Sequence, residues 1–211
     1  MSQADNQMPQ NPKHDPWQRT VRALKYSYPD SDQKHVAVIS IYDQRLYLYK
    51  NSRLFRTYPV STSRYGVGNK NGSYKTPLGL HRIVSKIGAD APLGAIFKGR
   101  KQTEEIARIF KTKVTLPYDL VTSRILRLEG LEVGVNKGAG IDTYGRYIYI
   151  HGTHEEGLIG QPASIGCVRM KNMDVIDLFK EIPESSLVLI VEGGKDQTVL
   201  ASEQQEKRAA Y

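Results

Sequence analysis

The chain has 211 residues, of which 39% are hydrophobic and 25% are charged. This composition is ordinary for a globular domain and excludes a fibrous or wholly disordered protein. Thirty Lys and Arg against 22 Asp and Glu give a net charge of +8, which favours an anionic partner such as nucleic acid, an acidic membrane or an acidic polymer.

The beginning of the sequence has neither the basic nor the apolar segment of a secretory signal. The longest aliphatic run covers residues 187–191, far short of the ~20 residues that span a bilayer, so no membrane span is expected. A single cysteine, Cys167, excludes an intrachain disulfide. We therefore expect a cytoplasmic protein, or a periplasmic one if an export signal precedes residue 1.

Residues 1–34 are polar and proline-rich, which predicts a mostly extended N-terminal arm with one docking turn around Trp17, Val21 and Leu24. The apolar alternation that starts at residue 35 predicts β-strands separated by turns. The edge strand among them is the one that holds Pro59, because proline cannot donate to a ladder. The expected strands cover residues 36–42, 46–49, 55–61 and 80–84, with a long loop over residues 63–77.

Residues 85–120 are the least regular part of the sequence. Thr103 to Phe110 predicts a short helix, with Thr103 as its N-cap. Residues 98–113 carry six Lys and Arg against two Glu. Such a charge run is more often a solvated face than a rim that attracts an acidic substrate, and both interpretations stay open.

Strands are expected over residues 124–128 and 146–150. A helix follows from Asn172 to Ile182, with Asn172 as its cap and Pro183 as its stop. A buried strand over residues 187–191 precedes a polar C-terminal tail, residues 194–211. The predicted architecture is a mainly β domain over residues 35–193 with one or two short helices.

Cys167 and His151 are the residues whose chemistry is most informative. His151 ends an apolar strand where a loop begins, and Cys167 follows a glycine just ahead of the expected helix. An imidazole that meets a thiol can take its proton, and the thiolate can then attack a carbonyl. Backbone N–H groups of Gly166 and Cys167 could hold the oxyanion, and Arg169 could bind a carboxylate.

Two other interpretations remain open at this point. A lone cysteine is usually a small buried hydrophobe, and a histidine at a strand end is usually structural. His151, His154, Glu155, Glu156 and Cys167 could also form a metal cluster, but their spacing lies at a strand-to-loop junction rather than on a helix face, which disfavours zinc.

Two sequence blocks contain these residues: Tyr147-Ile148-Tyr149-Ile150-His151-Gly152-Thr153 and Ser164-Ile165-Gly166-Cys167-Val168-Arg169-Met170. Together they resemble the signature of the L,D-transpeptidase catalytic domain (YkuD-type) family. Lys75-Thr76-Pro77-Leu78-Gly79 is similar to the family's Thr-Pro-x-Gly segment. The first strand pair and the helix after the cysteine match as well, so the resemblance runs from about residue 36 to 192.

The resemblance implies a β-sandwich-like fold and a peptidoglycan stem peptide or muropeptide as substrate, with no metal or organic cofactor. Cys167 corresponds to the nucleophile and His151 to the general base, oriented by a backbone carbonyl of Gly152 or Thr153. The thiolate would form a thioester with the diamino acid at the third stem position and release D-alanine. The substrate-binding residues expected around this pair are Arg169, Ser164 and Tyr149.

One position departs from the family pattern: Ile165 stands where many members carry a second histidine. An apolar side chain cannot assist proton transfer, so the base role rests on His151, and His154 is the only substitute nearby in sequence.

The acyl group could pass to an amine, which is transpeptidation, or to water, which is L,D-carboxypeptidation. Some family members similarly lack export signals and act as carboxypeptidases on muropeptides or precursors, so this outcome is a strong alternative here. A non-catalytic, basic peptidoglycan-binding module on the same fold is the rival from another class. Nucleic-acid binding is not expected, because the positive charge is scattered and no recognition motif is present. The oligomeric state is not predicted.

Overall fold

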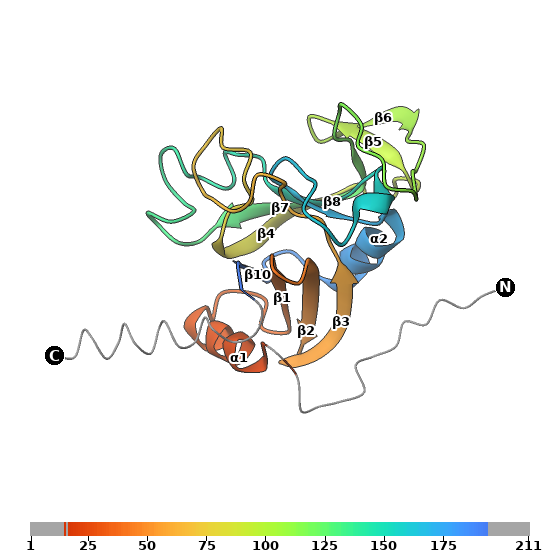
Figure 1. Cartoon of the computed structure of the whole chain (residues 1–211). Coiled ribbons are helices and arrows are strands. Elements are labelled where there is room, and N and C mark those ends of the chain that lie inside the picture. The colour runs from red at the N-terminus through yellow and green to blue at the C-terminus, as the bar shows by residue number, and fades with distance from the viewer. Residues whose placement is uncertain (1–14, 16, 194–211) are drawn as a thin grey trace.

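The computed structural model describes Asp15 and residues 17–193. These residues form a mainly β domain with a mixed sheet and two α-helices, which confirms the predicted fold class (Figure 1). The C-terminal tail, residues 194–211, lies outside the described residues. The elements in chain order are α1 (Gln18–Ser27), β1 (His35–Ser40), β2 (Arg45–Lys50), β3 (Arg53–Pro59), β4 (Gly79–Ile87), β5 (Ala95–Lys98), β6 (Lys101–Ile106), β7 (Val121–Gly130), β8 (Tyr149–Gly152), the 3-10 turn η2 (Glu156–Leu158), β9 (Val168–Met170), α2 (Asn172–Glu181) and β10 (Leu187–Val191).

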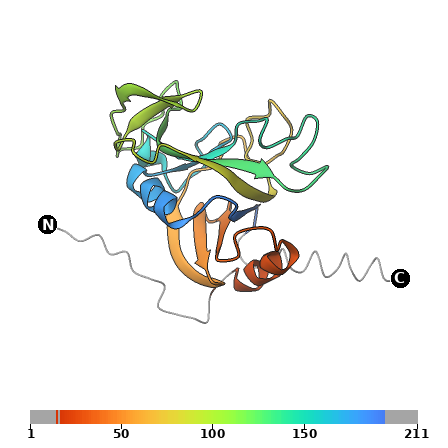
Figure 2. The same cartoon turned by 180° about the vertical axis from the view of Figure 1, so that it is seen from behind.

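The strands follow one hydrogen-bonded path, β3-β2-β1-β10-β4-β7-β5-β6, and β8 and β9 extend from β7. Two pairs are parallel, β1 with β10 and β8 with β9, and the others are antiparallel. The sheet bends along this path, so that β1–β3 run across the direction of β4 and β7 in both views (Figures 1 and 2).

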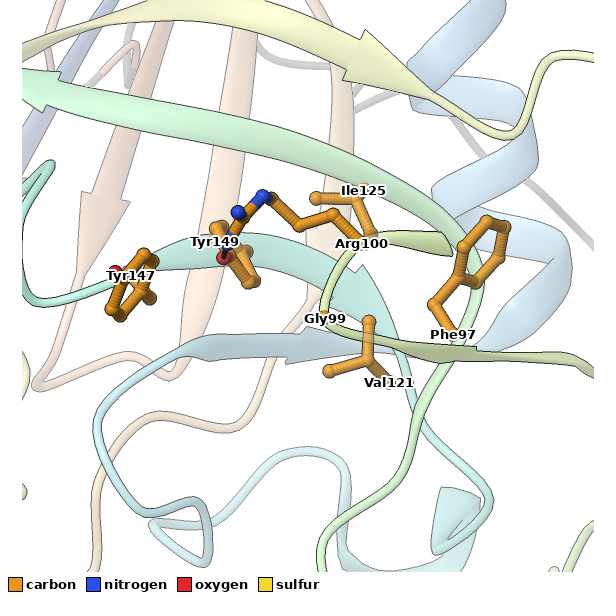
Figure 3. A pocket seen from close by; sticks show the side chains of 7 residues that line it. All are labelled: Phe97, Gly99, Arg100, Val121, Ile125, Tyr147 and Tyr149. Atoms are coloured by element: carbon orange, nitrogen blue, oxygen red, sulfur yellow. Dashed lines mark hydrogen bonds between the residues drawn. The ribbon is translucent and has the colours of Figure 1, made fainter. Parts of the chain in front are cut away.

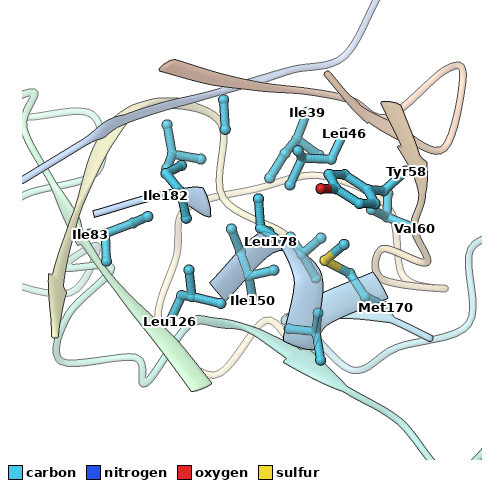
Figure 4. Packing of buried hydrophobic residues seen from close by; sticks show 14 of the residues in the cluster. Ile39, Leu46, Tyr58, Val60, Ile83, Leu126, Ile150, Met170, Leu178 and Ile182 are labelled. Atoms are coloured by element: carbon cyan, nitrogen blue, oxygen red, sulfur yellow. The ribbon is translucent and has the colours of Figure 1, made fainter. Parts of the chain in front are cut away.

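The main core fills the concave side of the bent sheet. Ile39 and Leu46 enter it from β1 and β2, Leu126 from β7, Ile150 from β8, and Leu178 from α2 (Figure 4). All five are fully buried. The helix therefore packs in the bend between the two halves of the sheet, and the β8 strand that carries His151 is anchored by the same apolar layer.

Residues 1–14 and 16 of the predicted N-terminal arm lie outside the described residues, and the described part differs from its prediction, because it contains a regular helix rather than one turn. α1 covers the outer side of β1 and β10, where Trp17 and Val21 are buried against Val36 and Leu189. A helix this short is marginal in water by itself, so its formation follows from the burial of this apolar stripe.

The prediction of a helix from Thr103 to Phe110 is wrong. The chain forms the β5–β6 hairpin instead, and residues 107–110 follow it without regular structure. The Thr103 hydroxyl, expected to cap a helix, donates a hydrogen bond to the Ile96 carbonyl across the hairpin. The tertiary contacts of Ala95 and Phe97, which are buried in a second cluster, outweigh the local helical pattern.

The helix after the cysteine lies where the sequence predicts it, but Asn172 does not cap it. Lys171 is the N-cap residue, and Asn172 is the first helical residue. Its buried amide accepts hydrogen bonds from the hydroxyls of Thr122 (2.7 Å) and Ser123 (2.6 Å) and donates to the Thr153 carbonyl (2.8 Å). Asn172 therefore connects α2 to β7 and to the segment that follows His151. Within the described residues, no helix is both long and apolar enough to cross a bilayer.

We predict that Asn172→Ala lowers the free energy of unfolding by about 3 kcal/mol, because several buried hydrogen-bonding groups lose their partner together. Urea unfolding followed by circular dichroism measures this change. Lys171→Ala, at the exposed neighbouring position, is the control and should stay within about 0.5 kcal/mol of the parent protein. A loss below about 1 kcal/mol for Asn172→Ala would contradict this role.

Candidate active site

The parallel pairing of β8 and β9 determines where Cys167 and His151 meet. His151 pairs with Arg169 in this ladder, and Ile150 pairs with Val168. Because side chains alternate along a strand, Cys167, two residues before Arg169, points to the same face as His151. Strand spacing and rise put the Cα atoms of Cys167 and His151 about 8 Å apart on this diagonal. The two predicted catalytic residues thus share one face of the sheet.

The Cys167 sulfur is held by the backbone of the opposite strand. Sγ accepts a hydrogen bond from the Tyr149 N–H at 3.4 Å and donates to the Tyr147 carbonyl at 3.5 Å. Its apolar neighbours belong to the cluster that contains Phe97 and Ile125. The residue keeps partial exposure, so a substrate carbonyl can approach it from the open side.

The turn before Cys167 is fixed by hydrogen bonds from two directions. Gly166 has a φ of +130°, which only glycine adopts without strain. The Ser164 hydroxyl donates to the Cys167 carbonyl at 2.6 Å and accepts from the Gly166 N–H at 3.3 Å. Thr76, from the Thr-Pro-x-Gly segment, donates to the Gly166 carbonyl at 3.0 Å. Ser164 is fully buried, so we assign it to shaping this turn rather than to substrate binding.

The two backbone amides expected to hold an oxyanion differ in whether they are free to donate. The Gly166 N–H is already engaged with Ser164. The Cys167 N–H has no acceptor among the described residues, so it is the amide that remains available to a substrate oxygen.

His151 is 1% exposed, and its ring is oriented by one short contact. Nδ1 lies 2.7 Å from the Gly152 carbonyl oxygen, which requires Nδ1 to carry a proton and leaves Nε2 as the basic atom. The Thr153 carbonyl accepts the Asn172 amide instead. Gly152 has no room for a side chain, since a Cβ there would lie 2.7 Å from the Thr122 carbonyl oxygen. Of the two carbonyls considered from the sequence, Gly152 is the one that contacts the imidazole.

Burial controls the charge of both groups. Desolvation raises the pKa of the Cys167 thiol to about 12, while the Tyr149 N–H opposes this shift. Desolvation also lowers the pKa of His151, against the effect of Asp119. No helix begins at Cys167 to stabilise a thiolate, because β9 intervenes before α2. At neutral pH the pair is thiol and neutral imidazole, and no hydrogen bond joins them among the described contacts.

Arg169 lies inside the domain rather than at a surface that a substrate could reach. It is 1% exposed, and its guanidinium pairs with Glu155 at 2.7 Å and Asp119 at 3.2 Å. The sequence predicts a substrate carboxylate as its partner, but two carboxylates of the chain occupy that role. We assign Arg169 to positioning, because it ties the segment before β7 to the strand that follows the cysteine.

Arg146 was not identified from the sequence as part of the site. Its guanidinium donates to the carbonyls of Lys75 at 2.6 Å and Gly68 at 3.1 Å, which fixes the long loop beside Cys167. Its charge also acts to lower the thiol pKa. No local sequence signal indicates this role of Arg146, because the loop that it contacts lies more than 70 residues earlier in the chain.

The remaining predicted residues have separate positions. Tyr149 lines a pocket beside the sulfur, with Arg100 and Tyr147 (Figure 3). Ile165 is 42% exposed next to the cysteine turn. His154 is buried and stacks on the Tyr118 ring at 5.5 Å between centroids, with no contact to the sulfur described.

Metal binding finds no support among the described residues, where no group of three or more His, Cys, Asp or Glu side chains could hold an ion. His151 and His154 are close in sequence but do not share a site, because His151 contacts the Gly152 carbonyl and His154 stacks on the Tyr118 ring.

Comparison with known proteins gives one consistent family. The family model described as the L,D-transpeptidase catalytic domain (YkuD) matches residues 34–190. The Bacillus subtilis (strain 168) protein named "Putative L,D-transpeptidase YqjB" is 41% identical over 61 residues, which are 29% of this chain and 35% of that protein.

Among solved structures, an L,D-transpeptidase from Mycobacterium smegmatis matches at 12% identity and a TM-score of 0.46, covering 75% of this chain and 58% of that one. L,D-transpeptidase 3 from Mycobacterium tuberculosis, solved with a faropenem-derived adduct, matches at 16% identity and a TM-score of 0.45, covering 75% and 60%. The chain therefore spans less than two thirds of the length of each of these relatives.

The raised thiol pKa predicts how Cys167 reacts with iodoacetamide. Because alkylation follows the thiolate fraction, its rate constant should rise about tenfold per pH unit from about pH 7 to about pH 9.5 without a plateau. Mass spectrometry of the single labelled cysteine measures the rate. The urea-unfolded protein is the reference and should level off above an ordinary thiol pKa of ~8.5. A plateau near neutral pH in the folded protein would mean that a thiolate–imidazolium pair already exists at rest.

Proposed function

The chain belongs to the L,D-transpeptidase catalytic domain family, and on this premise we propose that it is a cysteine acyltransferase that acts on peptidoglycan stem tetrapeptides. The proposed nucleophile is Cys167 and the proposed general base is His151. The observation that carries this assignment is the 2.7 Å contact between His151 Nδ1 and the Gly152 carbonyl oxygen. It fixes the ring so that a basic Nε2 lies on the same sheet face as the sulfur.

The first half-reaction begins from the neutral pair. As the sulfur attacks the carbonyl carbon of the third stem residue, its proton passes to His151 Nε2. The carbonyl oxygen becomes an oxyanion, to which the Cys167 N–H can donate. The C–N bond to D-alanine then breaks, and the imidazolium gives its proton to the leaving amine. The products are a Cys167 thioester and free D-alanine.

The neutral resting state is consistent with this order of events. A substrate that fills the open side of the site brings its own carbonyl to the sulfur, so that charge forms only when a bond forms with it. A permanently ionised thiolate in the same apolar surroundings would lack solvation, which explains why burial favours the protonated form.

The second half-reaction selects between two outcomes. An amine acceptor loses a proton to His151 and displaces Cys167, which gives a cross-linked peptide. A water molecule activated in the same way gives a tripeptide, which is L,D-carboxypeptidase activity. Both acceptors use the same pair of residues, and neither requires a metal or an organic cofactor in this scheme.

We predict that Cys167→Ala abolishes D-alanine release from a disaccharide tetrapeptide and that His151→Gln lowers its rate at least about 100-fold, because a general base contributes 10²–10⁴-fold. Liquid chromatography with mass spectrometry of the products measures both and separates dimer from tripeptide. His154→Gln, a histidine outside the proposed chemistry, is the matched control and should stay within about threefold. Near-normal turnover by folded His151→Gln would remove His151 from the base role.

We further predict that a carbapenem acylates Cys167, because its strained β-lactam carbonyl is an electrophile that the activated sulfur can attack. Intact-protein mass spectrometry should show one drug adduct on the parent protein and none on Cys167→Ala. Tight binding of glycan strands with neither adduct nor turnover would instead favour a basic peptidoglycan-binding module.

A further inference from the structure

A pocket of about 370 Å³ opens between the turn of the β5–β6 hairpin and strand β8. Its walls are mainly apolar, while one cation, Arg100, lies at its edge beside Tyr149 (Figure 3). The volume is in the range that holds a small ligand group. The lining residues are Phe97, Gly99, Arg100, Val121, Ile125, Tyr147 and Tyr149.

The pocket is adjacent to the reactive sulfur through the same two tyrosines. The Tyr149 N–H and the Tyr147 carbonyl are the backbone groups that contact Cys167 Sγ, at 3.4 and 3.5 Å. The side chains of these residues form one wall of the pocket. The pocket therefore lies directly beside the sulfur, within reach of a group carried next to a carbonyl that binds there.

The hairpin turn holds Arg100 in a conformation that favours glycine or asparagine. Gly99 and Arg100 have φ values of +56° and +68°, as in a two-residue type I′ turn. A non-glycine residue in this region costs about 1 kcal/mol or more. This turn places the Arg100 side chain beside Tyr147 and Tyr149.

The guanidinium of Arg100 is held at the pocket but not neutralised. It donates to the Tyr149 hydroxyl at 3.2 Å and lies over the Tyr147 ring, 5.2 Å from the centroid. No carboxylate forms an ion pair with it among the described residues, whereas Arg56, Arg82 and Arg169 all have such partners. Its remaining N–H groups are therefore available to an incoming anion.

An aliphatic chain that ends in a carboxylate fits this combination of apolar walls and an unpaired cation. We propose that the pocket binds the side chain of the diamino acid at the third position of the donor peptide, and that Arg100 binds a carboxylate carried on that side chain. This inference rests on the proposed function. The pocket would then select a diaminopimelate-type donor over a lysine-type donor.

The terminal carboxylate of the departing D-alanine is another carboxylate close to the reacting carbonyl of the donor. A residue with a single methyl group cannot fill a cavity of about 370 Å³, and it would leave the apolar surfaces of Phe97 and Ile125 uncovered. The volume and the walls therefore favour the longer side chain.

The first test measures binding without turnover, on the Cys167→Ala protein. Calorimetry compares three diaminopimelate tetrapeptides: one unmodified, one amidated on the side-chain carboxylate, and one amidated on the terminal D-alanine carboxylate. We expect side-chain amidation to weaken binding about tenfold, because a hydrogen-bonded charge pair is lost. Terminal amidation should leave binding within about twofold. Equal binding of all three peptides, or a loss confined to the terminal amide, would overturn the proposal.

The second test assigns the effect to Arg100. In the Cys167→Ala background, Arg100→Gln should weaken binding of the unmodified peptide about tenfold and remove its advantage over the side-chain amide. Lys101→Gln, which removes the same charge from the exposed neighbouring position, should change neither affinity more than twofold. An equal loss on both peptides from Arg100→Gln would indicate a structural role and overturn the assignment.

Turnover by the parent protein separates this inference from the proposed function. Selective, Arg100-dependent binding without any release of D-alanine would reject the acyltransferase and keep the pocket assignment. The opposite result is that the parent protein releases D-alanine and that Arg100→Gln leaves KM unchanged for both the unmodified peptide and the side-chain amide. This result would keep the acyltransferase and reject the pocket assignment.

Discussion

The register between two short parallel strands, β8 and β9, is the constraint on which the site depends. It places His151 opposite Arg169 and therefore puts the sulfur two residues earlier on the same face. The surrounding contacts hold this register: Asn172 secures the segment after His151, and Thr76 secures the turn before Cys167. A shift by one residue would turn one of the two groups to the opposite face. The relative placement of Cys167 and His151 is thus determined by backbone pairing, with no direct bond between the two side chains among the described contacts.

Electrostatic effects around the sulfur oppose one another. Burial and Asp119 favour the thiol, whereas the Tyr149 N–H, Arg146 and Arg169 favour the thiolate. Arg169 also pairs with Asp119, so part of the negative charge that would act against ionisation is compensated within the domain. The net effect is a raised thiol pKa, which keeps Cys167 protonated at neutral pH.

The sequence identifies the family, the mainly β class, the long loop and the last strand, because these depend on motifs and on strong local apolar patterns. Strand β8 begins three residues later than expected, since Tyr147 adopts a φ of +56°, which is not an extended conformation, just before the strand. The β5–β6 hairpin is not predicted from the sequence, because it has few apolar residues and its many charged residues are equally typical of an exposed helix. Arg169 and Ser164 were expected to bind substrate, yet both are buried. Arg169 pairs with Asp119, 50 residues earlier in the chain, and the Ser164 hydroxyl is engaged in its own turn by the Cys167 carbonyl. Arg100 could not be singled out locally, since it lies between Lys98 and Lys101. Arg146 could not be singled out either, since the carbonyls that it contacts belong to a distant segment of the chain.

The central position of β10 has a consequence for how the molecule is made. This strand lies between β1 and β4, and Val36 at the start of the domain pairs with Leu187 near its end. On the ribosome, therefore, β1–β3 cannot join the remainder of the sheet until nearly the whole domain has emerged. Until then both halves expose unpaired strand edges that invite aggregation. Assembly of the domain is consequently a late event in synthesis, dominated by contacts of high sequence separation.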